Sequence, residues 1–116
     1  MTNTSPKLSE RRCVPCEGGT KPLSTDEAQT LLAKLGDHWR LSADGKQITG
    51  TFEFKNYFRT LAFVNAVSYI AINEDHHPDI SFSYKLCSVL FWTHAINGLS
   101  ENDFICAAKV DALLNN

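Results

Sequence analysis

Residues 70–83 read IAINEDHHPDISFS, and they mark the point where a long helix ends and a strand begins. The residues before this stretch have the apolar spacing of a helix, whereas Ile80 and Phe82 alternate with polar residues as in a half-buried strand. Pro78 cannot continue a helix, and it disfavours helical geometry at the residue before it. The sequence therefore predicts that the paired histidines lie in a short connection between two regular elements.

The preceding helix is predicted to begin after Asn56, whose side chain can cap it, and to reach about Glu74. Residues spaced three or four apart form its expected core stripe: Phe58, Leu61, Val64, Val67 and Ala71. Further apolar residues widen this surface beyond one stripe: Phe63, Tyr69, Ile70 and Ile72. We expect such a helix to be covered on more than one side, by the sheet and by another chain.

After the first strand, a turn near residues 84–85 is expected to lead into a second strand over residues 86–93. One face of this strand carries Cys87, Val89 and Phe91. The opposite face carries Leu90 and Trp92, which would be exposed in a monomer. Single surface hydrophobes are common, so these two residues indicate either such scatter or an oligomer interface.

Towards the N-terminus, Ser24 and Glu27 form a capping box, and the apolar spacing after it predicts a helix over residues 24–35. Two strands are predicted next, over residues 39–41 and 47–54. The segment between them contains Asp-Gly, which is a strong hairpin signal.

Near the C-terminus, Ser100 supplies a hydroxyl cap for a last helix, which completes the order α-β-β-α-β-β-α. Two hairpins and three helices predict an α+β domain of two layers, in which the helices pack on one face of a four-stranded antiparallel sheet. The expected single domain covers residues 23–116. Residues 1–22 are expected to form an N-terminal leader, rich in proline, glycine and charge.

The composition limits the kinds of partner. The chain has 116 residues, 43% hydrophobic and 21% charged, which suits one domain that folds without a disulfide or metal staple. Its formal net charge of −2 provides no basic field for nucleic acid. No apolar run approaches the roughly 20 residues that span a bilayer, and the polar N-terminus lacks the apolar stretch of a signal peptide. We therefore expect a soluble, cytoplasmic protein without nucleic-acid or membrane partners.

Four cysteines need an interpretation. Cys13 and Cys16 form C-x-x-C in a polar, glycine-rich segment, where a closed zinc site would need further ligands and a thioredoxin-like motif would need a strand and a helix on either side. We interpret this pair as structural or incidental, with a metal or redox role as the alternatives. Cys87 and Cys106 lie in apolar runs and are expected to be small buried hydrophobes.

Three of the four histidines are expected to line one cleft, because His76 and His77 follow the long helix and His94 follows the last strand. Histidine gives and takes protons near neutral pH, so this set is a candidate for acid–base catalysis. The alternatives are a solvated histidine pair and a three-histidine metal site. His38 has no partner in view and is expected to be structural or exposed, and Asp103 is more simply a first-turn acid near its helix cap than a catalytic group.

The order of these residues along the chain matches the motif of a known protein family. The chain resembles the pterin-4a-carbinolamine dehydratases over about residues 13–114, through His76-His77-Pro78, the aromatic Tyr84, Thr93-His94 and Asp103. The flanks are similar as well: Trp39-Arg40-Leu41, Phe52-Glu53-Phe54, Gly98-Leu99-Ser100 and the leader motif CVPCEGG. The resemblance implies the α+β fold described above, assembled into a homodimer or homotetramer.

The resemblance also implies an activity. Members of this family are hydro-lyases that dehydrate 4a-hydroxytetrahydropterin to quinonoid dihydropterin in tetrahydropterin recycling, and they need no metal or organic cofactor. By this resemblance His76 and His94 are the acid–base pair, and His77 helps to bind or polarise the pterin. Further substrate contacts are expected from Glu74, Asp75, Pro78, Thr93 and Asp103. A functional link to phenylalanine hydroxylase, which produces the substrate, is also implied.

One position departs from the family pattern. Many members carry an acid four positions before the first histidine of the pair, where this chain has Ile72. Either Glu74 or Asp75 replaces that acid, or the substrate contact is absent. The alternative function is a non-catalytic regulatory or binding module of the same fold, either coactivator-like or linked to molybdopterin. Retention of all three histidines favours the enzyme, because a purely regulatory role needs no proton-transfer set.

Overall fold

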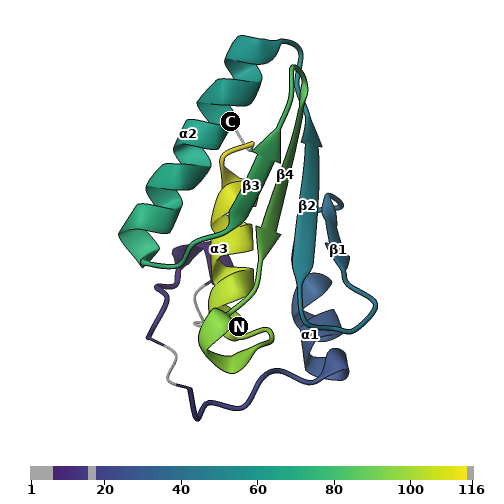
Figure 1. Cartoon of the computed structure of the whole chain (residues 1–116), viewed down its shortest axis with the longest axis vertical. Helices are drawn as coiled ribbons and strands as arrows, with labels where there is room; N and C mark the ends of the chain where they lie inside the picture. The colour runs from purple at the N-terminus through teal and green to yellow at the C-terminus, as the bar shows by residue number, and fades with distance from the viewer. Residues whose placement is uncertain (1–6, 16–17, 115–116) are drawn as a thin grey trace, which may run out of the picture.

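The computed structural model describes residues 7–15 and 18–114. Its regular elements confirm the predicted order α-β-β-α-β-β-α (Figure 1). They are α1 (Thr25–Leu32), β1 (Trp39–Leu41), β2 (Ile48–Glu53), α2 (Tyr57–Glu74), β3 (Asp79–Phe82), β4 (Leu86–Phe91) and α3 (Glu101–Ala112). Two short 3-10 helices, Leu8–Glu10 and His94–Ile96, precede α1 and α3 respectively. No helix within the described residues is both long enough and apolar enough to cross a membrane.

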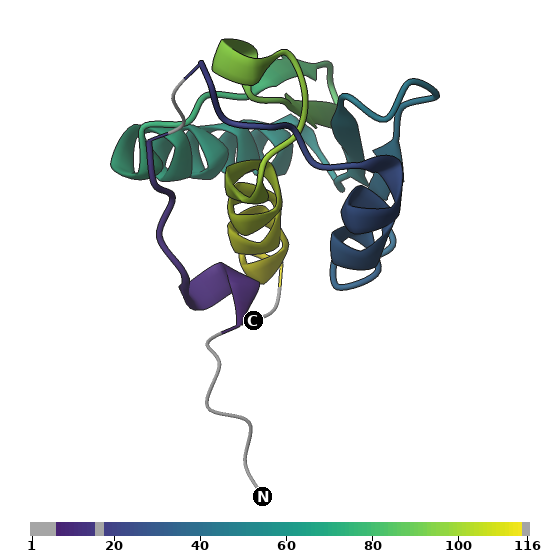
Figure 2. The same ribbon diagram turned by 90° about the horizontal axis from the view of Figure 1, so that it is seen from below.

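The four strands form one antiparallel sheet in the order β1-β2-β4-β3. The two predicted hairpins are therefore joined through β2 and β4, whose pairing runs from Ile48 opposite Phe91 to Glu53 opposite Leu86. All three helices lie on the same side of this sheet (Figure 2). The predicted two-layer α+β architecture is confirmed.

The core lies between the sheet and the helices, because the inward face of each central strand is apolar. On β2 and β4, fully buried residues alternate with partly or fully exposed ones, as expected for a sheet with one wet face. Gly50 lies on the buried face, where a Cβ atom would come within 2.9 Å of the Trp39 ring. The helices contribute further core side chains: Ala28, Phe63, Val67, Phe104, Cys106, Ala107 and Val110.

Local hydrogen bonds explain where the helices begin and end. The Glu27 N–H donates to Ser24 Oγ (3.1 Å) and the Ser24 N–H donates to Glu27 Oε1 (2.8 Å), which confirms the capping box of α1. α1 ends at Leu32, three residues before its predicted end, because the N–H groups of Lys34 and Leu35 bond to carbonyls three residues back. The last turn is therefore tighter than an α-helix.

The predicted core stripe of α2 is wrong in its first half. Phe58 is 81% exposed, and the buried positions of the helix are Thr60, Phe63, Val67 and Ala71. The Thr60 hydroxyl donates to the backbone oxygen of Tyr84 in the β3–β4 turn (2.9 Å). This contact turns Thr60 towards the sheet, and it leaves Phe58 on the outer face of the helix.

Residues 7–15 of the leader run along α3 (Figure 2). Lys109 Nζ donates to the backbone oxygen of Ser9 (2.9 Å), and Arg11 pairs with Glu101 (3.3 Å) at the other end of the helix. The leader is therefore part of the folded structure at residues 7–15. The boundary between leader and domain at residues 22 and 23 stays a prediction.

Candidate active site

The end of α2 positions the histidine pair. Asp75 adopts the left-handed conformation (φ 52°, ψ 46°), which a non-glycine residue rarely does and which aspartate tolerates better than most. The His76 N–H bonds back to the Ala71 oxygen (3.2 Å), so the chain reverses directly after the helix. His76 is thereby placed beside the core and His77 towards solvent, with side chains 11% and 74% exposed.

The third histidine reaches the same place from β4. After the strand ends at Phe91, Thr93 bridges Gly98 across a tight loop, and the Thr93 N–H donates to the Gly98 oxygen (2.8 Å). His94 opens the short 3-10 helix in this loop. As predicted, His76, His77 and His94 line one pocket, which has a volume of about 520 Å³.

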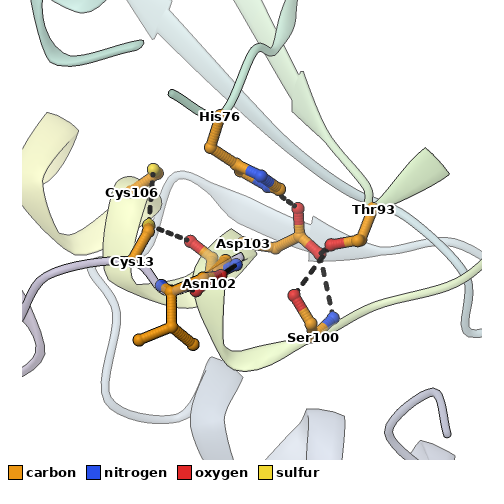
Figure 3. A network of polar contacts seen from close by, with 8 residues as sticks. Cys13, His76, Thr93, Ser100, Asn102, Asp103 and Cys106 are labelled. Atoms are coloured by element: carbon orange, nitrogen blue, oxygen red, sulfur yellow. Dashed lines mark hydrogen bonds and ion pairs between the residues drawn. The ribbon is translucent and has the colours of Figure 1, made fainter. Parts of the chain in front are cut away.

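A buried carboxylate holds His76. Asp103 is fully buried on the first turn of α3, and its Oδ1 lies 2.6 Å from His76 Nε2. Its other oxygen, Oδ2, accepts from the Thr93 hydroxyl (2.8 Å) and from the Ser100 N–H (3.0 Å). The network therefore joins the end of α2, the end of β4 and the start of α3 (Figure 3).

This network determines the hydrogen-bonding role of the His76 ring. Because the Asp103 carboxylate accepts from Thr93 and Ser100, His76 Nε2–H is the matching donor to its remaining oxygen. A neutral imidazole with its proton on Nε2 keeps Nδ1 as an acceptor. Asp103 therefore serves both as the capping acid that the sequence indicates and as the partner of His76, with one oxygen for each task.

The other two histidines are held differently. The His94 ring stacks on the Trp92 indole, with the ring centroids 4.0 Å apart and the planes 30° apart. His77 Nε2 lies 3.8 Å from Asp75 Oδ1, and both side chains are largely exposed. His94 is thus oriented by an aromatic surface, whereas His77 has a loose charge partner.

The residues expected to contact substrate divide into two groups. Glu74, Asp75 and Thr93 line the pocket with the three histidines. Pro78 and Asp103 are not among its lining residues, and Asp103 contacts the pocket indirectly, through the lining residues His76 and Thr93. Ile72, at the position where the family often has an acid, is 72% exposed and is likewise not a lining residue.

Glu74 is an acid with a buried side chain that lines the pocket, and residues of the leader contact it. Its Oε1 accepts from the Cys13 N–H (2.8 Å), and its Oε2 lies 2.9 Å from Arg12 Nε and 3.8 Å from Lys109 Nζ. Burial alone would raise the pKa of the Glu74 carboxyl, but the Cys13 N–H bond and the charges of Lys109 and Arg12 hold it below its usual value. Glu74 therefore fastens the leader at the edge of the pocket.

Glutamine at Glu74 is expected to lower the free energy of unfolding by about 1–2 kcal/mol near neutral pH, because the Cys13 N–H and the two cations lose their charged partner. The folded pKa of Glu74 lies below its unfolded pKa, so the stability that the charge provides is present above the unfolded pKa and is lost as pH falls through the folded pKa. Urea unfolding of both proteins near neutral pH and at acidic pH measures this difference, which should shrink on acidification.

The matched control for this prediction is Glu101→Gln. The Glu101 carboxylate makes an exposed ion pair with Arg11, so its loss is expected to change stability little. A Glu74→Gln protein as stable as the Glu101→Gln protein near neutral pH would contradict the anchoring role of Glu74.

Sequence reasoning missed several lining residues. The strand pattern predicts that Trp92 is a surface hydrophobe or part of an oligomer interface, whereas in the structure it lines the pocket and stacks on His94. The adjacency of Trp92, Thr93 and His94 was the available signal. Cys13, Val14 and Pro15 of the leader also line the pocket, and nothing in the local sequence indicates this long-range contact.

The predicted burial of Cys87 and Cys106 is confirmed, since neither side chain is exposed. Cys13, Cys87 and Cys106 are free thiols, and Cys16 of the C-x-x-C motif lies outside the described residues. Across residues 7–15 and 18–114, no group of three or more His, Cys, Asp and Glu side chains is arranged to hold a metal ion.

The chain is similar in sequence to members of a known protein family. The family model described as pterin 4 alpha carbinolamine dehydratase matches residues 21–113. A protein of Nitrosomonas eutropha, provisionally named a pterin-4-alpha-carbinolamine dehydratase, is 57% identical over 114 residues, which is 98% of each chain. A protein of Nitrosomonas europaea with the same provisional name is 55% identical over the full length of both chains.

Two solved structures are similar in fold. A transcriptional coactivator/pterin dehydratase from Brucella melitensis superposes with a TM-score of 0.75 at 30% identity, over 80% of this chain and 98% of that one. A pterin dehydratase-like protein identified as a RuBisCO assembly factor in the alpha-carboxysome has a TM-score of 0.57 at 28% identity, over 65% of this chain and 87% of that one. The same fold thus occurs in proteins described with catalytic and with assembly roles.

Proposed function

This chain belongs to the pterin 4 alpha carbinolamine dehydratase family, and we propose that it removes water from a 4a-hydroxytetrahydropterin to give a quinonoid dihydropterin. The observation that carries this proposal is the pocket itself, where His76, His77 and His94 meet and a buried Asp103 holds the first of them. The substrate would come from an enzyme that hydroxylates an aromatic ring with a tetrahydropterin, such as phenylalanine hydroxylase.

The reaction needs two proton transfers. The hydroxyl group on C4a is a poor leaving group as hydroxide, so a general acid must protonate it as the C–O bond breaks. The proton on N5 must leave to a general base as the C4a–N5 double bond forms. Water and the quinonoid dihydropterin are then the only products, and no electrons are exchanged with a cofactor.

We assign these transfers to His76 and His94. Asp103 keeps the Nε2 proton of His76 in place, which leaves Nδ1 as the ring nitrogen that can exchange a proton with substrate. His94, stacked on Trp92, provides the second imidazole from another wall of the pocket. His77 is the most exposed of the three and is assigned to binding or polarising the pterin, together with Thr93.

The test is the dehydration rate of 4a-hydroxytetrahydropterin, generated by a phenylalanine hydroxylase reaction, with and without this protein. Acceleration is expected, and it should persist when a chelator is added after the hydroxylase step, because the proposed transfers use imidazoles only. Loss of acceleration in chelator would replace the acid–base proposal with a metal-dependent one. The absence of acceleration by the folded protein would favour a binding role.

A surface on α2 favours an additional association role. Phe58, Tyr69 and Ile72 are 81%, 66% and 72% exposed, and they lie on the part of the helix that does not face the sheet. Large apolar side chains gathered on one exposed face are typical of interaction sites. We propose that this face is buried in a homodimer or homotetramer.

A further inference from the structure

The leader and α3 bring two thiols into contact. Cys13 Sγ lies 3.5 Å from Cys106 Sγ, although the residues are 93 positions apart in the chain. Cys13 Sγ also lies 3.6 Å from the backbone oxygen of Asn102, one turn before Cys106 on the same helix (Figure 3). Cys13 is half-buried, whereas Cys106 is completely buried.

Hydrogen bonds on both sides of Cys13 build this contact. The Cys13 N–H donates to Glu74 Oε1 (2.8 Å), which ties the leader to the end of α2. The next residue, Val14, exchanges two hydrogen bonds with the Asn102 side chain, at 3.0 Å and 2.5 Å. The backbone of the leader is thus fixed at the two positions that determine where the Cys13 side chain points.

We propose that Cys13 and Cys106 form a redox-modification site, at which a reversible disulfide fastens the leader to α3. A disulfide bond is about 2.0 Å long, so the two sulfurs must approach by about 1.5 Å. Cys106 lies within a helix, and hydrogen bonds hold the leader backbone on both sides of Cys13, so we assign this movement mainly to rotation of the Cys13 side chain.

The reaction balances with a small-molecule disulfide, such as oxidised glutathione, as the oxidant. The Cys13 thiol gives its proton to water, and its sulfur attacks one sulfur of the oxidant and releases the first small thiol. Cys106 then loses its proton to water and attacks Cys13 Sγ, which releases the second small thiol. Two protein thiols are oxidised to one disulfide, and one small disulfide is reduced to two thiols.

The surroundings of Cys106 affect the rate of this reaction. The hydrogen bond with Cys13, burial and the nearby charges of Glu74 and Asp103 raise the pKa of the Cys106 thiol. Because the thiolate is the attacking form, the second step is expected to be the slow one. The product carries no charge, so the same surroundings do not oppose the finished disulfide.

The cross-link would act on the pocket wall. Cys13, Val14 and Pro15 line the pocket beside the histidines, and a bond from Cys13 to Cys106 would attach this wall covalently to α3. It would also close a chain loop of more than 90 residues, which is the kind of loop for which a disulfide restricts the unfolded chain most. Oxidation is therefore expected to stabilise the fold together with its leader.

The experiment incubates the folded, reduced protein in glutathione buffers with a rising oxidised fraction, followed by alkylation and a tryptic digest without reductant. The expected product links the peptide of residues 13–34 to the peptide of residues 86–109, with fragment ions at Cys13 and Cys106. The melting temperature should rise by at least about 5 °C on oxidation and return on reduction.

Single cysteine variants test whether Cys13 and Cys106 are the two residues that form the cross-link. Cys16→Ser is expected to keep the cross-link, since that residue is the alternative partner of Cys13 in the C-x-x-C motif. Cys13→Ser and Cys106→Ala are expected to abolish both the cross-link and the oxidative rise in melting temperature. Cys13 is only partly buried at the edge of the core, whereas Cys106 is completely buried, so the Cys13 variant remains informative if the Cys106 variant folds poorly.

Three results would overturn the proposal: a Cys13–Cys16 linkage in place of the Cys13–Cys106 linkage, cross-links between chains only, or Cys13 and Cys106 both remaining free thiols in the Cys16→Ser protein under every buffer. Stoichiometric zinc held by the reduced Cys16→Ser protein would also overturn it, because the two thiols would then be metal ligands. All of these readouts are independent of pterin turnover, so they are distinguishable from a failure of the proposed activity.

Discussion

Alanine at His76 or at His94 is expected to lower the turnover of 4a-hydroxytetrahydropterin by about 10²–10⁴-fold, the usual contribution of one positioned acid or base. Both imidazoles line the pocket, and each is oriented by a different neighbour, Asp103 for His76 and Trp92 for His94. Stopped-flow measurement of kcat and KM for each variant tests this expectation.

The two variants should differ in chemical rescue. His94 is exposed, so its removal opens a space that solvent can reach, and added imidazole is expected to restore part of the turnover. His76 is 11% exposed and lies against Asp103, so the same addition should restore much less. This difference would not arise if the substitutions merely loosened the fold.

Two other histidines provide the controls. His38→Ala is expected to keep full turnover, because His38 bonds to the Thr51 oxygen (3.1 Å) and packs on Phe52 away from the three-histidine pocket. His77→Ala is expected mainly to raise KM. A folded His38→Ala protein as impaired as His94→Ala would show that the site has been placed wrongly.

The fold could be predicted from the sequence because its signals are local. The capping box at Ser24, the Asp-Gly turn and Pro78 each indicate an element boundary within a few residues. The burial of α2 could not be predicted in the same way, since apolar residues occur around much of this helix. Its orientation depends on the contact of Thr60 with the β3–β4 turn, which is a tertiary interaction.

The residues that gather at the site could be predicted from the sequence, but the contacts between their side chains could not. Two predicted element ends placed the three histidines together, and the structure confirms this. The local sequence indicates a capping acid at Asp103, and the family resemblance implies a substrate contact. Only the packing of α3 against the end of α2 reveals that one carboxylate oxygen meets His76 while the other caps the helix. The contact of Cys13 could not be predicted either. The cysteine nearest to it in sequence is Cys16, whereas the thiol that it contacts in the structure is Cys106.

Asparagine at Asp103 is expected to lower turnover by about 10²–10⁴-fold, even though Asp103 does not line the pocket. The asparagine amide offers one acceptor oxygen where the carboxylate uses two, so it cannot accept from His76 and from the pair of Thr93 and Ser100 together. If the amide NH₂ group faces His76, Nε2 must become the acceptor and the proton moves to Nδ1. The ring nitrogen that exchanges protons with substrate is then in the wrong state.

The free energy of unfolding of the Asp103→Asn protein is expected to fall by about 1–3 kcal/mol, because one buried donor is left without an acceptor. The matched control is Asp111→Asn on the same helix. Asp111 also accepts two hydrogen bonds, from the Gly36 N–H (2.7 Å) and from Trp39 Nε1–H (2.9 Å), but it lies outside the pocket. Asp111→Asn should therefore lose stability and keep kcat.

Comparison of the two variants separates a positioning role from a structural one. Unfolding midpoints in urea measure the stability of each, and kcat is measured where both proteins are fully folded. If Asp103 positions His76, only Asp103→Asn loses turnover, because only there does the lost hydrogen bond determine the tautomer of a proton-transfer residue. Equal kcat values in the two variants would mean that the 2.6 Å contact between His76 and Asp103 supports the fold alone.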